Sequence, residues 1–268
     1  MTLKNIEGIK NIIFDLGNVI IDLDAEATKQ DFKFLYGPDY KSVMADLKER
    51  KVFKKYETGN ISTQTFLNEL ASYDENISLD EVKNAWNAML LDIPEENYKI
   101  LTKTKEKYRT FCLSNTNKLH IDFIHKQLKS TKGLSNLNGF FEKVYYSHEI
   151  GKRKPDEDTF KFVLESNNLK AEETLFIDDT EKHLRGAEAL GIKVLHMDED
   201  MRLSDLFSWF FCAHQVYSWK DKESSDNFLI AEFIFLQGNG HYTCNQRLGV
   251  NINTYHRWTK FSQSEDVK

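Results

Sequence analysis

The stretch Asn11-Ile-Ile-Phe-Asp15-Leu-Gly17-Asn-Val-Ile-Ile21 decides how this chain folds. It opens as an apolar run, ends in the acid Asp15 and then reaches Gly17. A short apolar run bounded by a turn residue predicts a buried strand. An acid at the carboxyl end of such a strand lies where α/β sheets bind their ligands, and Gly17 permits a sharp turn that brings backbone amides close to an anion. The stretch therefore predicts a strand that places a reactive carboxylate at the ligand-binding edge of a sheet.

Three later apolar segments also end in polar side chains, each of a different chemical kind. Residues 110–114 end in a hydroxyl and an amide, residues 143–147 precede a lysine, and residues 174–178 end in paired acids: Ser114 and Asn115, Lys154, and Asp178 and Asp179. A single strand that ends in such a residue is commonly only a turn or a helix cap. The ordered set, read together with Asp15, instead indicates one site at which a carboxylate nucleophile attacks phosphate.

The segment at 25–94 differs from the rest because it shows no clear strand pattern. Its apolar residues recur at helical spacing, as in Phe66, Leu67 and Leu70, and this spacing predicts amphipathic helices. We therefore expect a helical cap inserted after the first strand.

Beyond residue 94, helices and strands alternate. Helices are expected near 98–108, 118–128, 156–167 and 181–190, and strands at 110–114, 143–147, 174–178 and 192–196. Alternation of this kind implies an α/β fold with a doubly wound parallel sheet and right-handed crossovers. We predict a Rossmann-like core formed by residues 1–24 and 95–204, followed by an atypical C-terminal extension at 205–268.

Composition excludes several classes of function. The chain of 268 residues has a net charge of −6 and no basic cluster with interleaved aromatic residues, which argues against a nucleic-acid partner. No apolar stretch approaches the roughly 20 residues that a membrane span needs, and the N-terminus lacks the apolar region of a signal peptide. Three cysteines do not form a disulfide framework. We expect a cytoplasmic enzyme without a membrane partner, whose oligomeric state stays open.

The motifs together resemble the haloacid dehalogenase superfamily, in particular its phosphatases with a small helical cap after the first strand. The likeness extends to the sugar-phosphate branch that reads Asp-Leu-Gly-Asn-Val, which includes α-D-glucose 1-phosphate phosphatases, and it spans about residues 8–200. The cap segment contributes one further phrase, Tyr56-Glu57-Thr-Gly59-Asn-Ile61-Ser62. The most specific matches are Ser147-x3-Gly151-x2-Lys154-Pro155-Asp156 and Phe176-Ile-Asp178-Asp179.

The resemblance implies a Mg²⁺-dependent phosphatase of a small phosphorylated metabolite, with Asp15 as the nucleophile that forms an aspartyl-phosphate. Mg²⁺ prefers oxygen ligands, and the resemblance assigns four residues to it: Asp15, the Gly17 carbonyl, Asp179, and Asp178, which would orient a metal-bound water. Three groups would hold the phosphoryl oxygens: Ser114, the Asn115 amide and Lys154. Lys154 would also act in catalysis by offsetting the repulsion between Asp15 and the acid pair.

Gly17 departs from the family pattern, because most of these phosphatases carry an aspartate there as general acid and base. Loss of such a group typically costs about 10²–10⁴-fold in rate. Asp22, Asp24 or a metal-held water could replace it. Alternatively, the substrate has an acidic leaving group, such as the anomeric oxygen of a hexose 1-phosphate, and this explanation fits the sugar-phosphate branch.

Two other functions compete with the phosphatase. A weakly active or inactive phosphate-binding or regulatory protein would explain Gly17 and the unusual C-terminal extension, but not the retention of the nucleophile, the lysine and the acid pair. A haloacid dehalogenase shares the nucleophile but needs no metal, so the pair Asp178-Asp179 would have no purpose.

Overall fold

The computed structural model describes residues 8–206, 231–238 and 241–248. The chain forms two compact units, residues 1–207 and 208–268. The described part of the second unit is an antiparallel hairpin of β6 (Ala231–Gly238) and β7 (His241–Leu248). Apart from this hairpin and residues 205–206, the predicted C-terminal extension lies outside the described residues.

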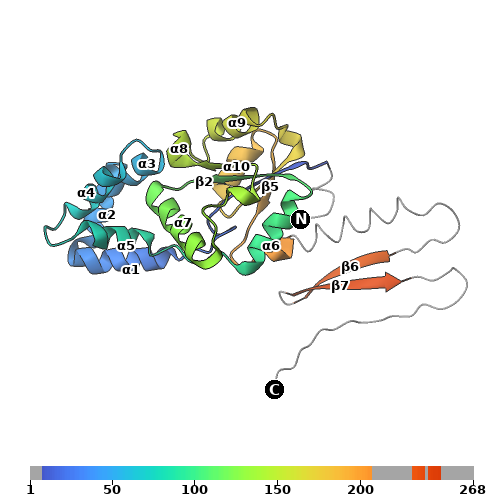
Figure 1. Ribbon diagram of the computed structural model, residues 1–268, viewed down its shortest axis with the longest axis horizontal. Coiled ribbons are helices and arrows are strands. Elements are labelled where there is room, and N and C mark those ends of the chain that lie inside the picture. The colour runs from blue at the N-terminus through green and yellow to red at the C-terminus, as the bar shows by residue number, and fades with distance from the viewer. Residues whose placement is uncertain (1–7, 207–230, 239–240, 249–268) are drawn as a thin grey trace, which may run out of the picture. The chain divides into compact units, whose positions relative to one another are not determined.

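A five-stranded parallel sheet forms the centre of the first unit (Figure 1). Its strands in chain order are β1 (Asn11–Phe14), β2 (Arg109–Ser114), β3 (Lys143–Tyr146), β4 (Thr174–Asp178) and β5 (Lys193–His196). They lie side by side in the order β3-β2-β1-β4-β5. β2 and β3 lie on one side of β1, whereas β4 and β5 lie on the other side. The strand order therefore reverses at β1, and ligands bind at such points in α/β sheets. The predicted doubly wound α/β sheet is confirmed.

Asp15 follows β1 directly and lies between the ends of two neighbouring strands. Phe14 is in register with Cys112 of β2 and Ile177 of β4. The backbone N–H of Asp15 donates to the carbonyl of Ile177 at 2.8 Å and so extends the ladder by one bond. β4 therefore holds the backbone of Asp15 in place.

Helices α6 (Glu95–Lys105), α7 (Lys118–Lys132), α8 (Ser147–Ile150), α9 (Glu157–Ser166) and α10 (Glu181–Glu188) connect the strands. Short 3-10 helices lie at η3 (Asn138–Phe140) and η4 (Ala171–Glu173). Predicted boundaries differ by a few residues. α6 begins earlier because Pro94 precedes it and acids fill its first turn, where the helix dipole favours them. α7 continues to Lys132 and ends at Gly133, whose left-handed φ of 69° suits a helix terminus.

The segment between β1 and α6 is helical, as its apolar spacing predicts. Its elements are α1 (Ala25–Tyr36), η2 (Gly37–Asp39), α2 (Tyr40–Glu49), α3 (Val52–Glu57), α4 (Thr63–Ala71) and α5 (Leu79–Asn87), called the cap helices below. Ser62 begins α4 by accepting a hydrogen bond from the N–H of Thr65. α5 begins with a capping box between Ser78 and Glu81. Local capping thus sets where these helices start.

The buried apolar residues of the first unit include two clusters. One lies between the sheet and helices α9 and α10, and includes Ile13, Phe111 and Phe176. The other lies among the cap helices around Phe66, and it also takes in Leu119 of α7. The shared cluster ties the cap helices to the helix that follows β2. Among the described helices, none combines the length and apolar composition that crossing a bilayer requires.

Candidate active site

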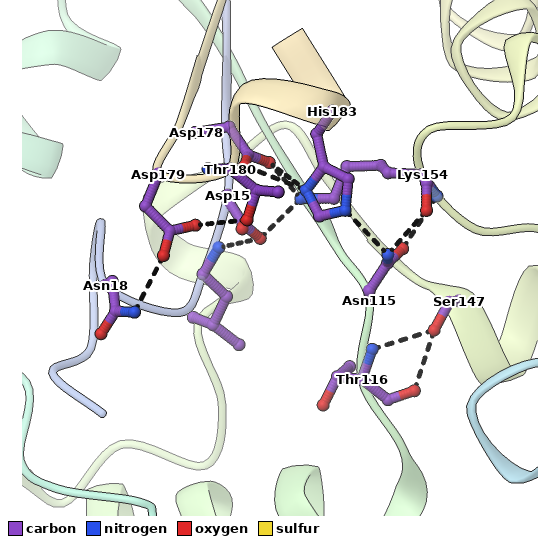
Figure 2. Close-up of polar contacts among 11 residues, drawn as sticks. Asp15, Asn18, Asn115, Thr116, Ser147, Lys154, Asp178, Asp179, Thr180 and His183 are labelled. Carbon is purple, nitrogen blue, oxygen red and sulfur yellow. Dashed lines mark hydrogen bonds and ion pairs between the residues drawn. The ribbon is translucent and has the colours of Figure 1, made fainter. Parts of the chain in front are cut away.

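Lys154 lies at the centre of the site, among the residues drawn in Figure 2. Its side chain is fully buried. Its ammonium Nζ is 2.8 Å from Oδ1 of Asp15 and 2.6 Å from Oδ2 of Asp178. These three residues come from the ends of β1 and β4 and from the loop before α9. A buried ammonium is tolerated only with such partners, because desolvation of an unpaired charge costs several kcal/mol. The structure thus brings together three of the residues singled out from the sequence.

The three charges shift one another's proton affinity. Burial raises the pKa of Asp15, although Lys154 lowers it and Asp178 raises it further. Burial also acts to raise the pKa of Asp178, but Lys154 and His183 outweigh burial and hold that pKa below its ordinary value. Asp15 is therefore the carboxylate whose negative charge is less well compensated.

Asn115 holds the backbone of Lys154 from the end of β2. The side-chain Nδ2 of Asn115 donates to the carbonyl of Lys154 at 2.9 Å, and the Lys154 N–H donates back to Oδ1 at 2.9 Å. Because this pairing commits the side-chain amide of Asn115, its backbone N–H is the group left for the phosphate-binding role that the sequence suggests. Ser114, the last residue of β2, is buried beside it.

His183 belongs to the site, although the sequence analysis did not identify it. Its Nδ1 lies 3.0 Å and 3.1 Å from the two carboxylate oxygens of Asp178, and its Nε2 lies 3.4 Å from Nδ2 of Asn115 (Figure 2). Since the bonds to Lys154 fix Nδ2 as the donor, Nε2 accepts and the Nδ1–H donates to Asp178. The sequence feature that could have pointed to His183 is its position in the first turn of α10, shortly after the acid pair Asp178-Asp179.

Asn18 links the turn after β1 to the end of β4. Its Nδ2 donates to Oδ2 of Asp179 at 2.8 Å, and its Oδ1 accepts from the N–H of Leu23 at 3.2 Å. Asn18 has a φ of 54°, in the left-handed region that asparagine tolerates better than most residues. Thr180 donates to the other oxygen of Asp179 at 3.2 Å. Asn18 is a second residue of the site that the motifs alone did not single out.

Ser147 fastens the ends of β2 and β3 to each other. Its Oγ accepts from the N–H of Thr116 and donates to the Thr116 carbonyl, both at 2.9 Å. The serine of the Ser147-x3-Gly151 motif therefore contacts backbone groups and not the acids. It keeps the strand ends aligned beneath the site.

The residues expected to hold Mg²⁺ lie at the ends of β1 and β4. Asp15, Asp178 and Asp179 bring three negative charges against the single positive charge of Lys154, so a divalent cation suits the charge balance. Ligand atoms of Asp15, Asp178 and His183 lie within 4.8 Å of one another, whereas Asp179 is outside that group and contacts Asn18. The carboxylates and the Gly17 carbonyl are the oxygen donors that Mg²⁺ prefers. The residues present therefore fit this ion.

Comparison with known proteins agrees with this geometry. The profile of the haloacid dehalogenase-like hydrolases matches residues 12–197. The chain is 27% identical over 186 residues to D-ribitol-5-phosphate phosphatase from Bacteroides thetaiotaomicron, an alignment that covers 69% of this chain and 90% of the relative.

Solved structures give the same result. A haloacid dehalogenase family enzyme from Bacteroides thetaiotaomicron matches with a TM-score of 0.70 and 32% identity, over 75% of this chain and 99% of that enzyme. Its complex with magnesium and inorganic phosphate matches with a TM-score of 0.65 and 32% identity, over 74% and 99%. A predicted hydrolase of the same family from Porphyromonas gingivalis matches with a TM-score of 0.65 and 32% identity, over 81% and 99%. The chain belongs to the haloacid dehalogenase-like hydrolases, the family that its strand-end motifs resemble.

Proposed function

We propose that this haloacid dehalogenase-like enzyme is a Mg²⁺-dependent phosphatase that hydrolyses a small phosphomonoester through an aspartyl-phosphate on Asp15. The observation that carries the proposal is the buried Lys154 ammonium between Asp15 and Asp178 at the switch point of the sheet. Mg²⁺ is the expected cofactor because the site is rich in oxygen donors, and because the similar Bacteroides enzyme has been crystallised with magnesium and inorganic phosphate.

In the reaction that we propose, Asp15 attacks phosphorus and the bond from phosphorus to the leaving oxygen breaks. Lys154 stays charged and attracts the phosphoryl oxygens, while Ser114 and the backbone N–H of Asn115 donate hydrogen bonds to them. Bound Mg²⁺ supplies positive charge against the repulsion between two anions. Water then cleaves the aspartyl-phosphate and regenerates Asp15.

The substrate class that we propose is a phosphorylated sugar or sugar alcohol. The Asp-Leu-Gly-Asn-Val motif suggests a hexose 1-phosphate, whose anomeric leaving oxygen is comparatively acidic. The relative that acts on D-ribitol 5-phosphate instead suggests an ester of a primary alcohol, whose leaving oxygen is strongly basic. The two substrates make opposite demands on an enzyme with Gly17, because only the basic leaving oxygen needs a proton donor.

Phosphate release from a panel that includes glucose 1-phosphate, glucose 6-phosphate and ribitol 5-phosphate tests the function. Each substrate is assayed with Mg²⁺ and with EDTA, using the wild type and Asp15→Asn. We expect Mg²⁺-dependent release that disappears in the variant. Lack of release from every substrate by folded wild type, together with retained phosphate binding, would support the inactive phosphate-binding protein that Gly17 favours.

A further inference from the structure

A cavity of about 340 Å³ between α3 and the loop that leads into α9 is lined mainly by positive side chains. Lys51, Lys54 and Lys55 line it from the side of the cap helices, and Lys152 and Arg153 line it from the core. We call this cavity the basic crevice. The whole chain has a net charge of −6, so positive charge is concentrated here against the overall balance of the protein.

Three of the five cations carry a charge that no acid compensates. Lys51, Lys54 and Lys55 form no ion pair within the part of the chain that the structure describes, whereas the other two cations are paired with acids. The lining offers one acid without an ion pair among these residues, Asp156. The crevice therefore has a surplus of two positive charges. A phosphate group, with a charge of about −1.5 to −2 at neutral pH, matches this surplus.

Arg153 adds hydrogen-bond donors to the crevice. It makes one ion pair, in which its Nη2 lies 3.1 Å from Oε2 of Glu57, and its Nε has no hydrogen-bond partner in the described structure. A guanidinium presents five N–H donors in a planar fork that suits the oxygens of phosphate. Arg153 thus has donors beyond those that Glu57 occupies.

Lys51 brings its charge to the crevice from a strained backbone. Its φ of 57° and ψ of 33° lie in the left-handed region, where it connects α2 to α3. Glycine adopts this conformation without a steric penalty, whereas a residue with a Cβ does not. The side chain of Lys51 is therefore present at a conformational cost, and strained residues of this kind are frequent at functional sites.

We propose that the basic crevice is a second binding site, specific for a phosphate group and separate from the catalytic centre. Asp15, Asp178 and Asp179 do not line the crevice. The ammonium groups of the unpaired lysines surround the phosphate oxygens, and the bound group joins α3 to the loop before Lys154. The phosphate group belongs either to a free ligand, such as inorganic phosphate, or to the second phosphate of a bisphosphorylated substrate. Binding itself does not depend on the phosphatase reaction.

Titration calorimetry with inorganic phosphate in EDTA tests the site directly. Without Mg²⁺, the three acids around the catalytic centre repel phosphate, so binding under these conditions reports the basic crevice. NaCl keeps the ionic strength constant, because salt screens the attraction between exposed charges. We expect the wild type to bind phosphate, and Lys54→Gln/Lys55→Gln to bind it at least about 10-fold more weakly, since charge-assisted hydrogen bonds are lost.

Lys41→Gln/Lys48→Gln is the matched control. It removes the same amount of charge from exposed lysines of α2 that do not line the crevice, and it should change the phosphate affinity by less than about 2-fold, because screening weakens the effect of distant charges. Equal weakening in the two double variants would show attraction to the overall charge alone and would overturn the site. Absence of binding to folded wild type, or unchanged affinity in Lys54→Gln/Lys55→Gln, would also overturn it.

Kinetics distinguishes the two sources of the phosphate group, and this measurement rests on the proposed function. Values of kcat/KM are compared for glucose 1-phosphate and glucose 1,6-bisphosphate. In Lys54→Gln/Lys55→Gln, a loss of at least about 10-fold confined to the bisphosphate assigns the crevice to the second phosphate of the substrate. Unchanged values for both, together with phosphate binding in EDTA, assign it to a separate ligand. If folded wild type hydrolyses neither compound, the proposed function fails, whereas calorimetry still decides the site.

Discussion

The side chain of Asn115 and the backbone of Lys154 exchange two hydrogen bonds of 2.9 Å each, one in each direction. The pair connects the end of β2 to a loop that lies 39 residues further along the chain. It sets where the Lys154 side chain starts on its way to Asp15. Positioning of the ammonium therefore depends on a residue whose side chain need not touch the substrate.

Asn115→Ala should lower kcat/KM by about 10²-fold, since a displacement of about 1 Å in a catalytic group has effects of this size. The loss should fall mainly on kcat, because the charge of Lys154 is still present for binding. Steady-state kinetics on the best substrate measures this split. Retention of full kcat would show that the loop keeps its position without Asn115.

Lys154→Met should unfold more easily than the wild type, in addition to losing activity. The substitution leaves the buried carboxylates of Asp15 and Asp178 without their ammonium, and breaking such a buried pair typically costs about 3–5 kcal/mol. Urea unfolding at neutral pH without Mg²⁺ gives the free energy directly. Lys152→Met serves as control, because Lys152 pairs with Asp158 at a partly exposed position and should change stability by about 1 kcal/mol or less.

Asp15→Asn should be more stable than the wild type at pH 8. The pKa of Asp15 is higher in the folded state than in the unfolded state, so ionisation of its carboxyl group destabilises the folded protein. This loss of stability begins above the pKa of the unfolded state and is complete above the pKa of the folded state. The gain from the neutral amide should therefore shrink as the pH falls toward 4. Thermal unfolding at both pH values measures the difference. Added Mg²⁺ should reverse the order at pH 8, since it would stabilise the wild type by binding.

His183→Ala should weaken Mg²⁺ binding by about 10–100-fold, the usual effect of removing a partner that orients a metal-site carboxylate. Without the Nδ1–H, Asp178 keeps Lys154 at Oδ2 and the backbone N–H of Thr180 at Oδ1, but it loses the ring donor that contacts both oxygens. Calorimetric titration with Mg²⁺ measures the affinity without relying on turnover. His183→Asn, whose amide can donate in place of the ring, should recover part of the loss; unchanged affinity in both variants would contradict the orienting role.

The fold follows from local sequence patterns to a large degree. Apolar runs bounded by turn residues located all five parallel strands, because a strand buried on both faces has little room for polar residues. Helix ends were less well placed: α7 continues past Leu128 to Lys132, since Gly133 and not the nearby polar residues ends it. The spacing of apolar residues shows which face of a helix is buried, but it does not show where the last turn of the helix ends.

The site was predictable where a motif follows a strand, and unpredictable where partners meet only in three dimensions. Asp15, Lys154 and Asp178 are brought together by strand order, which the alternation of elements implies. Asn18 depends on a left-handed turn, and His183 meets Asp178 and Asn115 only in the folded chain. The spacing of residues along the sequence does not indicate these contacts.

The strand that precedes Asp15 is synthesised first, yet it gains its second neighbour only when β4 has been made. β1 lies between β2 and β4, so one of its edges stays unpaired until residue 178 has left the ribosome. An unpaired edge of four apolar or buried residues is a template for pairing with another chain. Synthesis that stalls between β3 and β4 would therefore leave a nascent chain that chaperones have to shield, and chains truncated before β4 should aggregate instead of folding to a partly active enzyme.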